Sequence, residues 1–223
     1  MAVGKFRELL PSLLFFQFIK GWRIANFPFR FTVKLPETHN ATMVHNHFMG
    51  MALQQARRAG KMGEVPIGAV VVRPTRDGRY EILSQAYNLV ETRQDASAHA
   101  ELLALKQAAK KVKNWRLLNA TLYASLEPCP MCLTACQAFR ISSIVYAAPD
   151  LRLGAIESHV RLLDIPHPFH SVQEVVPGIQ KNESAELLRS FFRERRKTLT
   201  ESNRKDGWRS WISRFLMVNL NRR

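Results

Sequence analysis

The chain of 223 residues contains only three cysteines, and two of them, Cys129 and Cys132, stand three positions apart. If that pair holds a metal, no pair remains for a disulfide framework, so the sequence favours a reducing compartment. Long apolar runs are also missing. The longest, residues 9–19, is eleven residues long and is interrupted by Pro11, Ser12 and Gln17. Eleven residues are too few to cross a bilayer, so we predict no integral membrane segment.

Acidic residues are scarce as well, with 18 Asp and Glu against 33 Lys and Arg, which gives a net charge of +15. Residues 1–42 hold six basic residues against two acidic ones, and residues 189–223 hold eleven against three. The middle of the chain, residues 43–188, carries sixteen against thirteen. Basic flanks favour a polyanion such as RNA as partner, although a solvated basic tail that only maintains solubility fits the charge equally well.

A chain of this length with 46% hydrophobic residues can bury one sizeable core and is short for two catalytic domains. We expect a basic and apolar N-terminal extension (residues 1–42), one catalytic domain (43–198) and a basic amphipathic C-terminal extension (199–223). The first part lacks a signal-peptide cleavage pattern, and its few acids favour targeting to an organelle, a plastid or a mitochondrion. The alternative is an upstream extension of the reading frame before Met43, with a cytoplasmic protein.

Hydrophobic periodicity within residues 43–198 predicts an α/β fold. Helical stripes alternate with short apolar strands, which requires crossover connections and helices on both faces of a sheet. We therefore predict a three-layer α/β/α sandwich with a mixed sheet of about five strands. The predicted helices span residues 44–60, 97–112, 129–140, 158–163 and 183–198, and the predicted strands span residues 66–72, 81–88, 120–126, 143–148 and 171–176.

Two short motifs carry the chemistry: His99-Ala100-Glu101 and Pro128-Cys129-Pro130-Met131-Cys132. One imidazole and two thiolates can hold a zinc ion and leave one tetrahedral position open for water. Water bound there has a pKa of about 7, so hydroxide is available at neutral pH. We assign His99, Cys129 and Cys132 as ligands of one zinc ion, and Glu101 as the general acid and base of a hydrolytic removal of an amine, a pattern typical of nucleobase deaminases.

Both motifs lie at predicted helix starts, where the positive end of the helix dipole favours thiolates, and Ser97 is the expected N-cap of the first helix. A structural zinc knuckle with Cys136 as fourth ligand is the alternative. On one helix Cys136 lies seven residues beyond Cys129, roughly 10 Å along the axis, whereas sulfurs that share a zinc ion lie roughly 4 Å apart. Cys136 is therefore expected to be a buried small apolar residue.

Beyond the zinc motifs, residues 43–197 resemble the bacterial and organellar tRNA adenosine deaminases of the cytidine and deoxycytidylate deaminase superfamily. The resemblance rests on Asn88 and on five runs of residues, 63–69, 98–101, 121–123, 126–129 and 191–196, the last being Phe-Phe-Arg-Glu-Arg-Arg. It implies a cytidine-deaminase-like fold, a homodimer, and conversion of the wobble adenosine of tRNA anticodons to inosine.

The resemblance also implies that three residues, Asn88, Ile67 and Asp150, contact the substrate nucleoside or its neighbour. It implies that the aromatic and basic final helix holds tRNA phosphates through Arg193, Arg195, Arg196 and Lys197. From the residues alone, simpler alternatives remain open for all three. Asn88 ends a strand, Ile67 is a core residue, or Asp150 caps a turn.

Two rival functions fit part of the sequence. A deaminase of a free base or nucleotide, such as guanine, cytosine or deoxycytidylate, would share the zinc site without needing a basic final helix. A non-catalytic subunit that positions RNA would lack the catalytic acid, and the presence of Glu101 counts against it. The runs at residues 150–154 (Asp-Leu-Arg-Leu-Gly) and 133–136 (Leu-Thr-Ala-Cys) depart from the family pattern, which affects contacts with neighbouring nucleotides and with a partner subunit.

Overall fold

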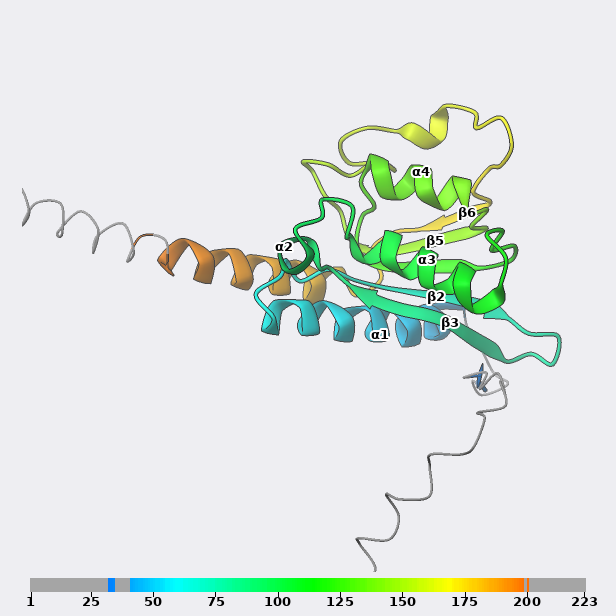
Figure 1. Ribbon diagram of the computed structural model, residues 1–223, viewed down its shortest axis with the longest axis horizontal. Helices are drawn as coiled ribbons and strands as arrows, with labels where there is room; N and C mark the ends of the chain where they lie inside the picture. Colours follow the sequence, from blue (N-terminus) through cyan, green and yellow to red (C-terminus); the bar gives the residue numbers. More distant parts are fainter. Residues whose placement is uncertain (1–31, 35–40, 199, 201–223) are drawn as a thin grey trace, which may run out of the picture. The chain divides into compact units, whose positions relative to one another are not determined.

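A six-stranded mixed sheet, in the order β1-β3-β2-β4-β5-β6, forms the middle layer of the fold (Figure 1). The computed structural model describes residues 32–34, 41–198 and 200, all within the unit formed by residues 31–223. The strands are β1 (Thr32–Val33), β2 (Gly68–Pro74), β3 (Tyr80–Tyr87), β4 (Thr121–Leu126), β5 (Ser143–Ala148) and β6 (Glu174–Val176). The helices are α1 (Ala41–Lys61), α2 (Val90–Arg93), α3 (Ala100–Val112), α4 (Pro130–Ala138), a 3-10 turn at Leu162–Asp164, and an unlabelled helix over residues 181–198.

The type of strand pairing changes once across the sheet, at β4. The neighbours β1, β3, β2 and β4 pair antiparallel, whereas β4, β5 and β6 pair parallel. Antiparallel β2 and β3 are joined by the short turn between Pro74 and Tyr80, while the parallel pair of β4 and β5 needs α4 as its crossover. The predicted mixed sheet is thus confirmed, with six strands in place of about five. The additional strand is β1, two residues of the expected N-terminal extension that pair with β3.

Alternating side chains of the strands build two separate cores. Val70 and Val72 of β2 belong to the cluster under α1, together with Tyr123 and Val145, whereas Ala69 and Val71 face the cluster that includes α3 and α4. A period of two along each strand is what a sheet covered on both faces requires. Figure 1 shows α1 on one side of the sheet and α3 and α4 on the other, so the three-layer prediction is confirmed. None of the described helices is long and apolar enough to span a membrane.

Local structure departs from the prediction in the segment after β5. A helix was expected over residues 158–163, but only a single 3-10 turn forms there. The backbone N–H groups of Ile156, Glu157 and Ser158 all donate to the carboxylate of Glu127 at 2.9 to 3.1 Å. Because a distant carboxylate supplies the acceptor, these residues do not depend on helical hydrogen bonds. The strand expected over residues 171–176 is shorter, Glu174–Val176.

One further expectation needs correction at the start of α3. The N-cap is His99 rather than Ser97, and its side chain makes no capping hydrogen bond. Ser97 instead donates both its N–H and its hydroxyl to the Asp95 carboxylate, in a turn that precedes the helix. The short helix α2 was not predicted, because four residues are too few to show a helical period.

Gly68 permits the closest approach between the sheet and α1. A Cβ at this position would overlap the backbone carbonyl of Ala52 and lie 2.5 Å from the backbone nitrogen of Ala56. Since both contacts are with helix backbone, no side-chain rotation relieves them, and α1 would have to move away from β2.

We therefore expect Gly68→Ala to lower the free energy of unfolding by about 3 kcal/mol in urea titrations. The matched control is Gly50→Ala on α1, where nothing lies within 4 Å of the new Cβ. That change should be neutral or stabilise by up to about 1 kcal/mol, because Ala is the better helix former. Equal effects of the two substitutions would contradict the packing argument.

Candidate active site

The N-termini of α3 and α4 meet beside the end of β4, and this meeting builds the site. His99 is the N-cap of α3 and Cys129 is the N-cap of α4. Both residues are extended in backbone conformation, and neither side chain caps its own helix. The imidazole and the thiol are therefore free to turn toward each other, and Cys132 follows one turn into α4 on the same side.

His99, Cys129 and Cys132 converge as the sequence predicts. The His99 Nδ1 atom lies 3.7 Å from the sulfur of Cys129 and 3.5 Å from that of Cys132. The three ligand atoms all lie within 4.8 Å of one another, the only such His, Cys, Asp and Glu group among the described residues. Cys132 is buried, while His99 and Cys129 are half-buried.

Hydrogen bonds within the group already favour a thiolate. Donation from the Cys132 thiol, with a contribution from His99, lowers the pKa of Cys129 to about 4. The same hydrogen bond and burial raise the pKa of Cys132, and the contact with Cys129 raises that of His99. Zinc replaces these shared protons, because it binds thiolates and neutral imidazole.

Glu101 lies on the first turn of α3, next to this group. Its side chain is only 4% exposed, and within the described chain its Oε2 is the one buried side-chain oxygen or nitrogen atom without a hydrogen-bond partner. Burial raises the pKa of Glu101 to about 7. A buried oxygen that no described residue pairs is available to accept a hydrogen bond from a bound water molecule or substrate. The donor set of one imidazole and two thiolates, with this acid beside it, fits one zinc ion whose fourth position is left to solvent or substrate.

Cys136 lies outside the ligand group. It is fully buried among apolar residues of the core that α3 and α4 share, including Leu133 and Ile141. Its position matches the expectation of a small apolar core residue, and the arrangement offers no support for Cys136 as a fourth ligand.

Asn88 and Ile67 are brought together on one side of the group. The Asn88 N–H donates to the Ile67 carbonyl at 3.0 Å, across the antiparallel pair of β2 and β3. The Asn88 side chain, 3% exposed, donates its Nδ2 to the carboxylate of Glu64 at 3.1 Å. The same carboxylate accepts the N–H groups of Glu91 and Thr92 at the start of α2. Glu64 thus fixes which end of the Asn88 amide faces it.

Asp150 lies on the loop that the Glu127 carboxylate holds. Its N–H donates to Glu127 at 3.1 Å, and its own carboxylate accepts the N–H of Arg152 at 3.0 Å. Gly154 packs directly on the Glu127 carboxyl group, where any Cβ would overlap it. The Ala155 N–H donates to the Pro128 carbonyl at 2.9 Å, so this loop is bonded to the segment that leads into Cys129.

Sequence reasoning did not single out Glu64 and Glu127 as site residues, although both lie in the runs that carry the family resemblance. Each is almost fully buried and accepts several backbone N–H groups, which is unusual for a glutamate without a cationic partner. The sequence offered one indication of these two residues: each is an acidic residue between apolar and proline residues, next to one end of a predicted strand.

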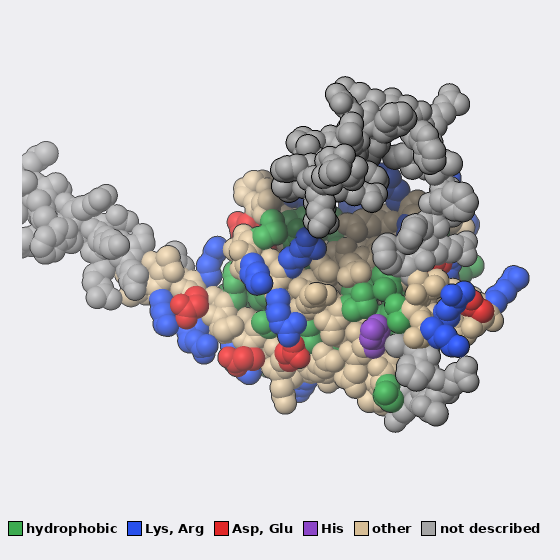
Figure 2. Space-filling view, turned by 90° about the horizontal axis from the view of Figure 1, so that it is seen from below, with side chains coloured by type: hydrophobic (Ala, Val, Ile, Leu, Met, Phe, Trp, Pro, Cys, Tyr) green, Lys and Arg blue, Asp and Glu red, His purple; other side chains and the backbone are tan. Residues whose placement is uncertain are grey.

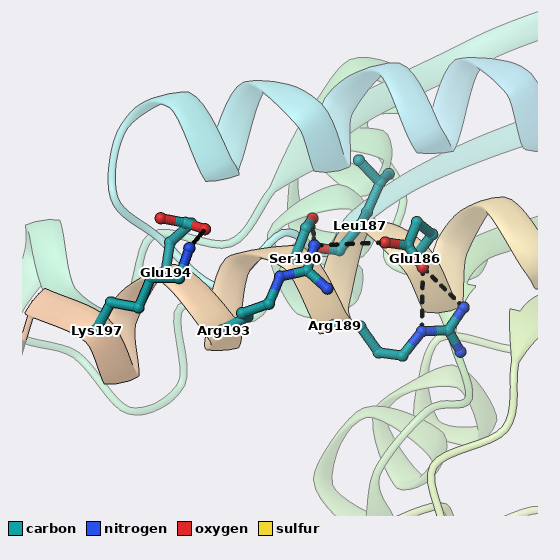
Figure 3. A network of polar contacts seen from close by, with 7 residues as sticks. All are labelled: Glu186, Leu187, Arg189, Ser190, Arg193, Glu194 and Lys197. Carbon is teal, nitrogen blue, oxygen red and sulfur yellow. Dashed lines mark hydrogen bonds and ion pairs between the residues drawn. The ribbon is translucent and has the colours of Figure 1, made fainter.

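The four basic residues expected to hold RNA do not share one face. Arg193 and Arg196 line a groove of about 600 Å³ between the 181–198 helix and the 149–152 loop, opposite Asp150. Arg195 stacks over the ring of Phe191, which lines a different groove, beside α1. Lys197 pairs with Glu194 at 3.0 Å, and Arg193 shares Glu186 with Arg189 (Figure 3). Figure 2 shows the resulting mixture of basic and acidic side chains along this helix.

Comparison with known proteins agrees with this site. Residues 42–148 match the family model for the cytidine and deoxycytidylate deaminase zinc-binding region, so fold and site define a zinc-type deaminase. Over 150 residues the chain is 43% identical to the tRNA-specific adenosine deaminase of Agrobacterium fabrum, an alignment that covers 67% of this chain and 95% of that protein. The chain therefore belongs to the tRNA-specific adenosine deaminase family.

Two further relatives agree with this assignment. A solved structure from studies of A-to-I editing by tRNA:A34 deaminases at the wobble position superimposes with a TM-score of 0.58 at 42% identity, covering 64% of this chain and 99% of that one. The chloroplastic tRNA(adenine(34)) deaminase of Arabidopsis thaliana is 39% identical over 160 residues, which is 65% of this chain. This chain spans only 12% of the length of that plant protein.

Removal of a thiolate ligand should empty the metal site. We expect Cys132→Ser to reduce the zinc content, measured by elemental analysis, from about one ion per chain to a small fraction, because a serine hydroxyl is a far weaker zinc ligand. The matched control is Cys136→Ala, which should keep the zinc and lose only stability. Loss of zinc from the control would mean that Cys136 is a ligand after all.

The Glu64 carboxylate should contribute to stability in a pH-dependent way. Burial alone raises its pKa, but hydrogen bonds from the side chain and N–H of Thr92, from the Glu91 N–H and from Asn88 together lower it below the ordinary 4.5. A lowered pKa in the folded state means that the contribution is complete above about pH 4.5 and is lost as the pH falls through the folded value.

We expect Glu64→Gln to lower the free energy of unfolding by about 2 kcal/mol at pH 7, and by progressively less below about pH 4.5, in urea titrations. Both proteins carry the same zinc ligands, so the difference between them isolates the carboxylate. A difference that stays constant with pH would show that packing, and not charge, makes Glu64 important.

Proposed function

We propose that this protein converts the wobble adenosine of tRNA anticodons to inosine by zinc-dependent hydrolysis. The observation that carries the proposal is the His99, Cys129 and Cys132 group with the unpartnered Glu101 oxygen beside it, in a chain 43% identical to a tRNA-specific adenosine deaminase. The reaction adds water to adenosine, forms a carbon–oxygen bond at the purine C6, breaks the bond to the exocyclic amine and releases ammonia.

When bound, zinc acts as a Lewis acid that makes a water molecule nucleophilic at neutral pH. Glu101 accepts one proton of the attacking water at its free carboxylate oxygen and delivers it to the purine ring nitrogen. It then takes the second proton, from the hydroxyl formed at C6, and delivers it to the departing amine, which leaves as ammonia. Burial raises the pKa of Glu101, which favours a carboxyl group that can both hold and release a proton. Burial excludes bulk water, which would otherwise compete for these protons.

Asn88, Ile67 and Asp150 are proposed to form the base pocket and its rim. Glu64 holds the Asn88 amide nitrogen, which leaves the carbonyl oxygen as the acceptor for a donor group of the nucleoside. Ile67 is hydrogen-bonded to Asn88 through the backbone and supplies an apolar wall. The Glu127 carboxylate keeps the Asp150 loop against the Cys129 segment, where a neighbouring nucleotide would lie.

An anticodon loop offers unstacked bases, so one of them enters such a pocket at little unpairing cost. The groove lined by Arg193 and Arg196 is proposed to receive the adjoining phosphates. Arg152 lies 5.8 Å from the ring centre of Phe192 in the same groove, an arrangement suited to stacking against a base. Arg195 and Lys197, on other faces of the 181–198 helix, would act at longer range.

We further propose that the protein forms a homodimer and acts in an organelle. The plant relative is named chloroplastic, which supports the second point. The expected targeting segment (residues 1–42) and the expected C-terminal extension (residues 199–223) lie almost entirely outside the described residues. The extents of the three parts stay predictions.

The test is inosine mapping on total tRNA after incubation with the purified zinc-loaded protein. Glu101→Gln should retain zinc but lower the rate of inosine formation by a factor on the order of 10³, because the proton relay is lost. Glu91→Gln on α2 is the matched control, since its carboxylate is exposed and should not affect the rate. Ammonia release from free guanine, cytosine or deoxycytidylate, with no inosine in tRNA, would establish the free-base alternative instead.

A further inference from the structure

A second basic and aromatic surface lies at the far end of the helices that build the active site. Trp115 and Arg116 follow the end of α3, Arg140 follows the end of α4, and Phe169 lies on the loop before β6. We name these four residues the basic-aromatic patch. His99 lies at the other end of α3, which has 13 residues, so the patch is about 20 Å from the zinc ligands.

Cations and rings alternate across the patch. The Arg116 guanidinium lies 4.0 Å from the Trp115 ring centre, and the Arg140 guanidinium lies 5.5 Å from Trp115 and 5.9 Å from Phe169. Trp115 is 47% exposed and Phe169 is 76% exposed. Stacking holds a guanidinium by its flat face and leaves the N–H donors at its edge free for a further partner.

The patch has no acidic counterpart. The three chain segments that form it, residues 113–120, 138–144 and 165–173, contain no Asp or Glu, and add Lys113 to the two arginines. Within the described part of the chain, no ion pair involves Lys113, Arg116 or Arg140. Arg140 donates to the Gln137 carbonyl at 2.9 Å, which anchors it at the end of α4.

We infer that the basic-aromatic patch binds the polynucleotide of the tRNA at a point outside the anticodon stem-loop. Exposed rings with arginines between them offer stacking for unpaired bases and donors for phosphates, the two contacts that single-stranded RNA uses. This inference rests on the proposed function, because a tRNA held at the active site is large enough to reach a surface about 20 Å away. A free base is not.

The experiment compares binding of full-length tRNA and of its isolated anticodon stem-loop, by titration of labelled RNA with the zinc-loaded protein. The double substitution Trp115→Ala and Phe169→Ala should weaken binding of full-length tRNA about tenfold and leave stem-loop binding unchanged. Arg116→Ala, at an exposed position, should reduce the slope of log affinity against log salt by about one for full-length tRNA only.

Arg79→Ala in the turn between β2 and β3 is the matched control, since it removes one exposed positive charge that Asp77 already pairs. It should leave both affinities unchanged. Equal binding of the two RNAs by the unaltered protein, or equal weakening of both by the double substitution, would overturn the inference. So would conversion of a dimer to a monomer, because the patch would then contact a second copy of the chain. Binding without inosine formation would contradict the proposed reaction and leave the patch assignment intact.

Discussion

The site depends on the approach of two helix N-termini to each other. Because His99 and Cys129 are N-cap residues, their extended backbones direct an imidazole and a thiol into the space between α3 and α4. The sheet fixes that approach, since β4 leads directly into α4. On the opposite face of the sheet, the close contact at Gly68 fixes the position of α1. The positive ends of both helix dipoles point at the same place, which stabilises thiolates and any anion that forms there.

Two buried carboxylates, those of Glu64 and Glu127, connect the loops around the ligand group to one another. Glu64 joins the Asn88 side chain to the start of α2, and Glu127 joins the Asp150 loop to the Cys129 segment. Each carboxylate accepts hydrogen bonds from several backbone N–H groups. In these loops the carboxylate therefore supplies the acceptors that backbone carbonyls supply in a regular helix or strand.

Basic residues of this protein indicate a surface that binds RNA only where no acidic residue pairs with them. The 181–198 helix is rich in arginine, yet several of its cations are matched by Glu186 and Glu194, and its basic residues divide between two grooves. The basic-aromatic patch carries fewer cations, and among the described residues none of them has an acidic partner. Exposed and unmatched charge is what attracts a polyanion, because paired charge is largely cancelled at its surface.

The sequence by itself predicted the His99, Cys129 and Cys132 group that could hold zinc, the adjacent acid, the layered α/β fold and its main elements. These depend on short spacings and on periods of two or 3.6 residues, which are local properties of the chain. Only the tertiary structure decided that Glu64 reaches Asn88, that Glu127 accepts the N–H groups of residues 156–158, and that Arg140 lies over the rings of both Trp115 and Phe169. It also decided that His99 displaces Ser97 as N-cap. The side-chain contacts among these join residues 24 to 31 positions apart, and packing selects them from many possible partners that the sequence pattern does not distinguish.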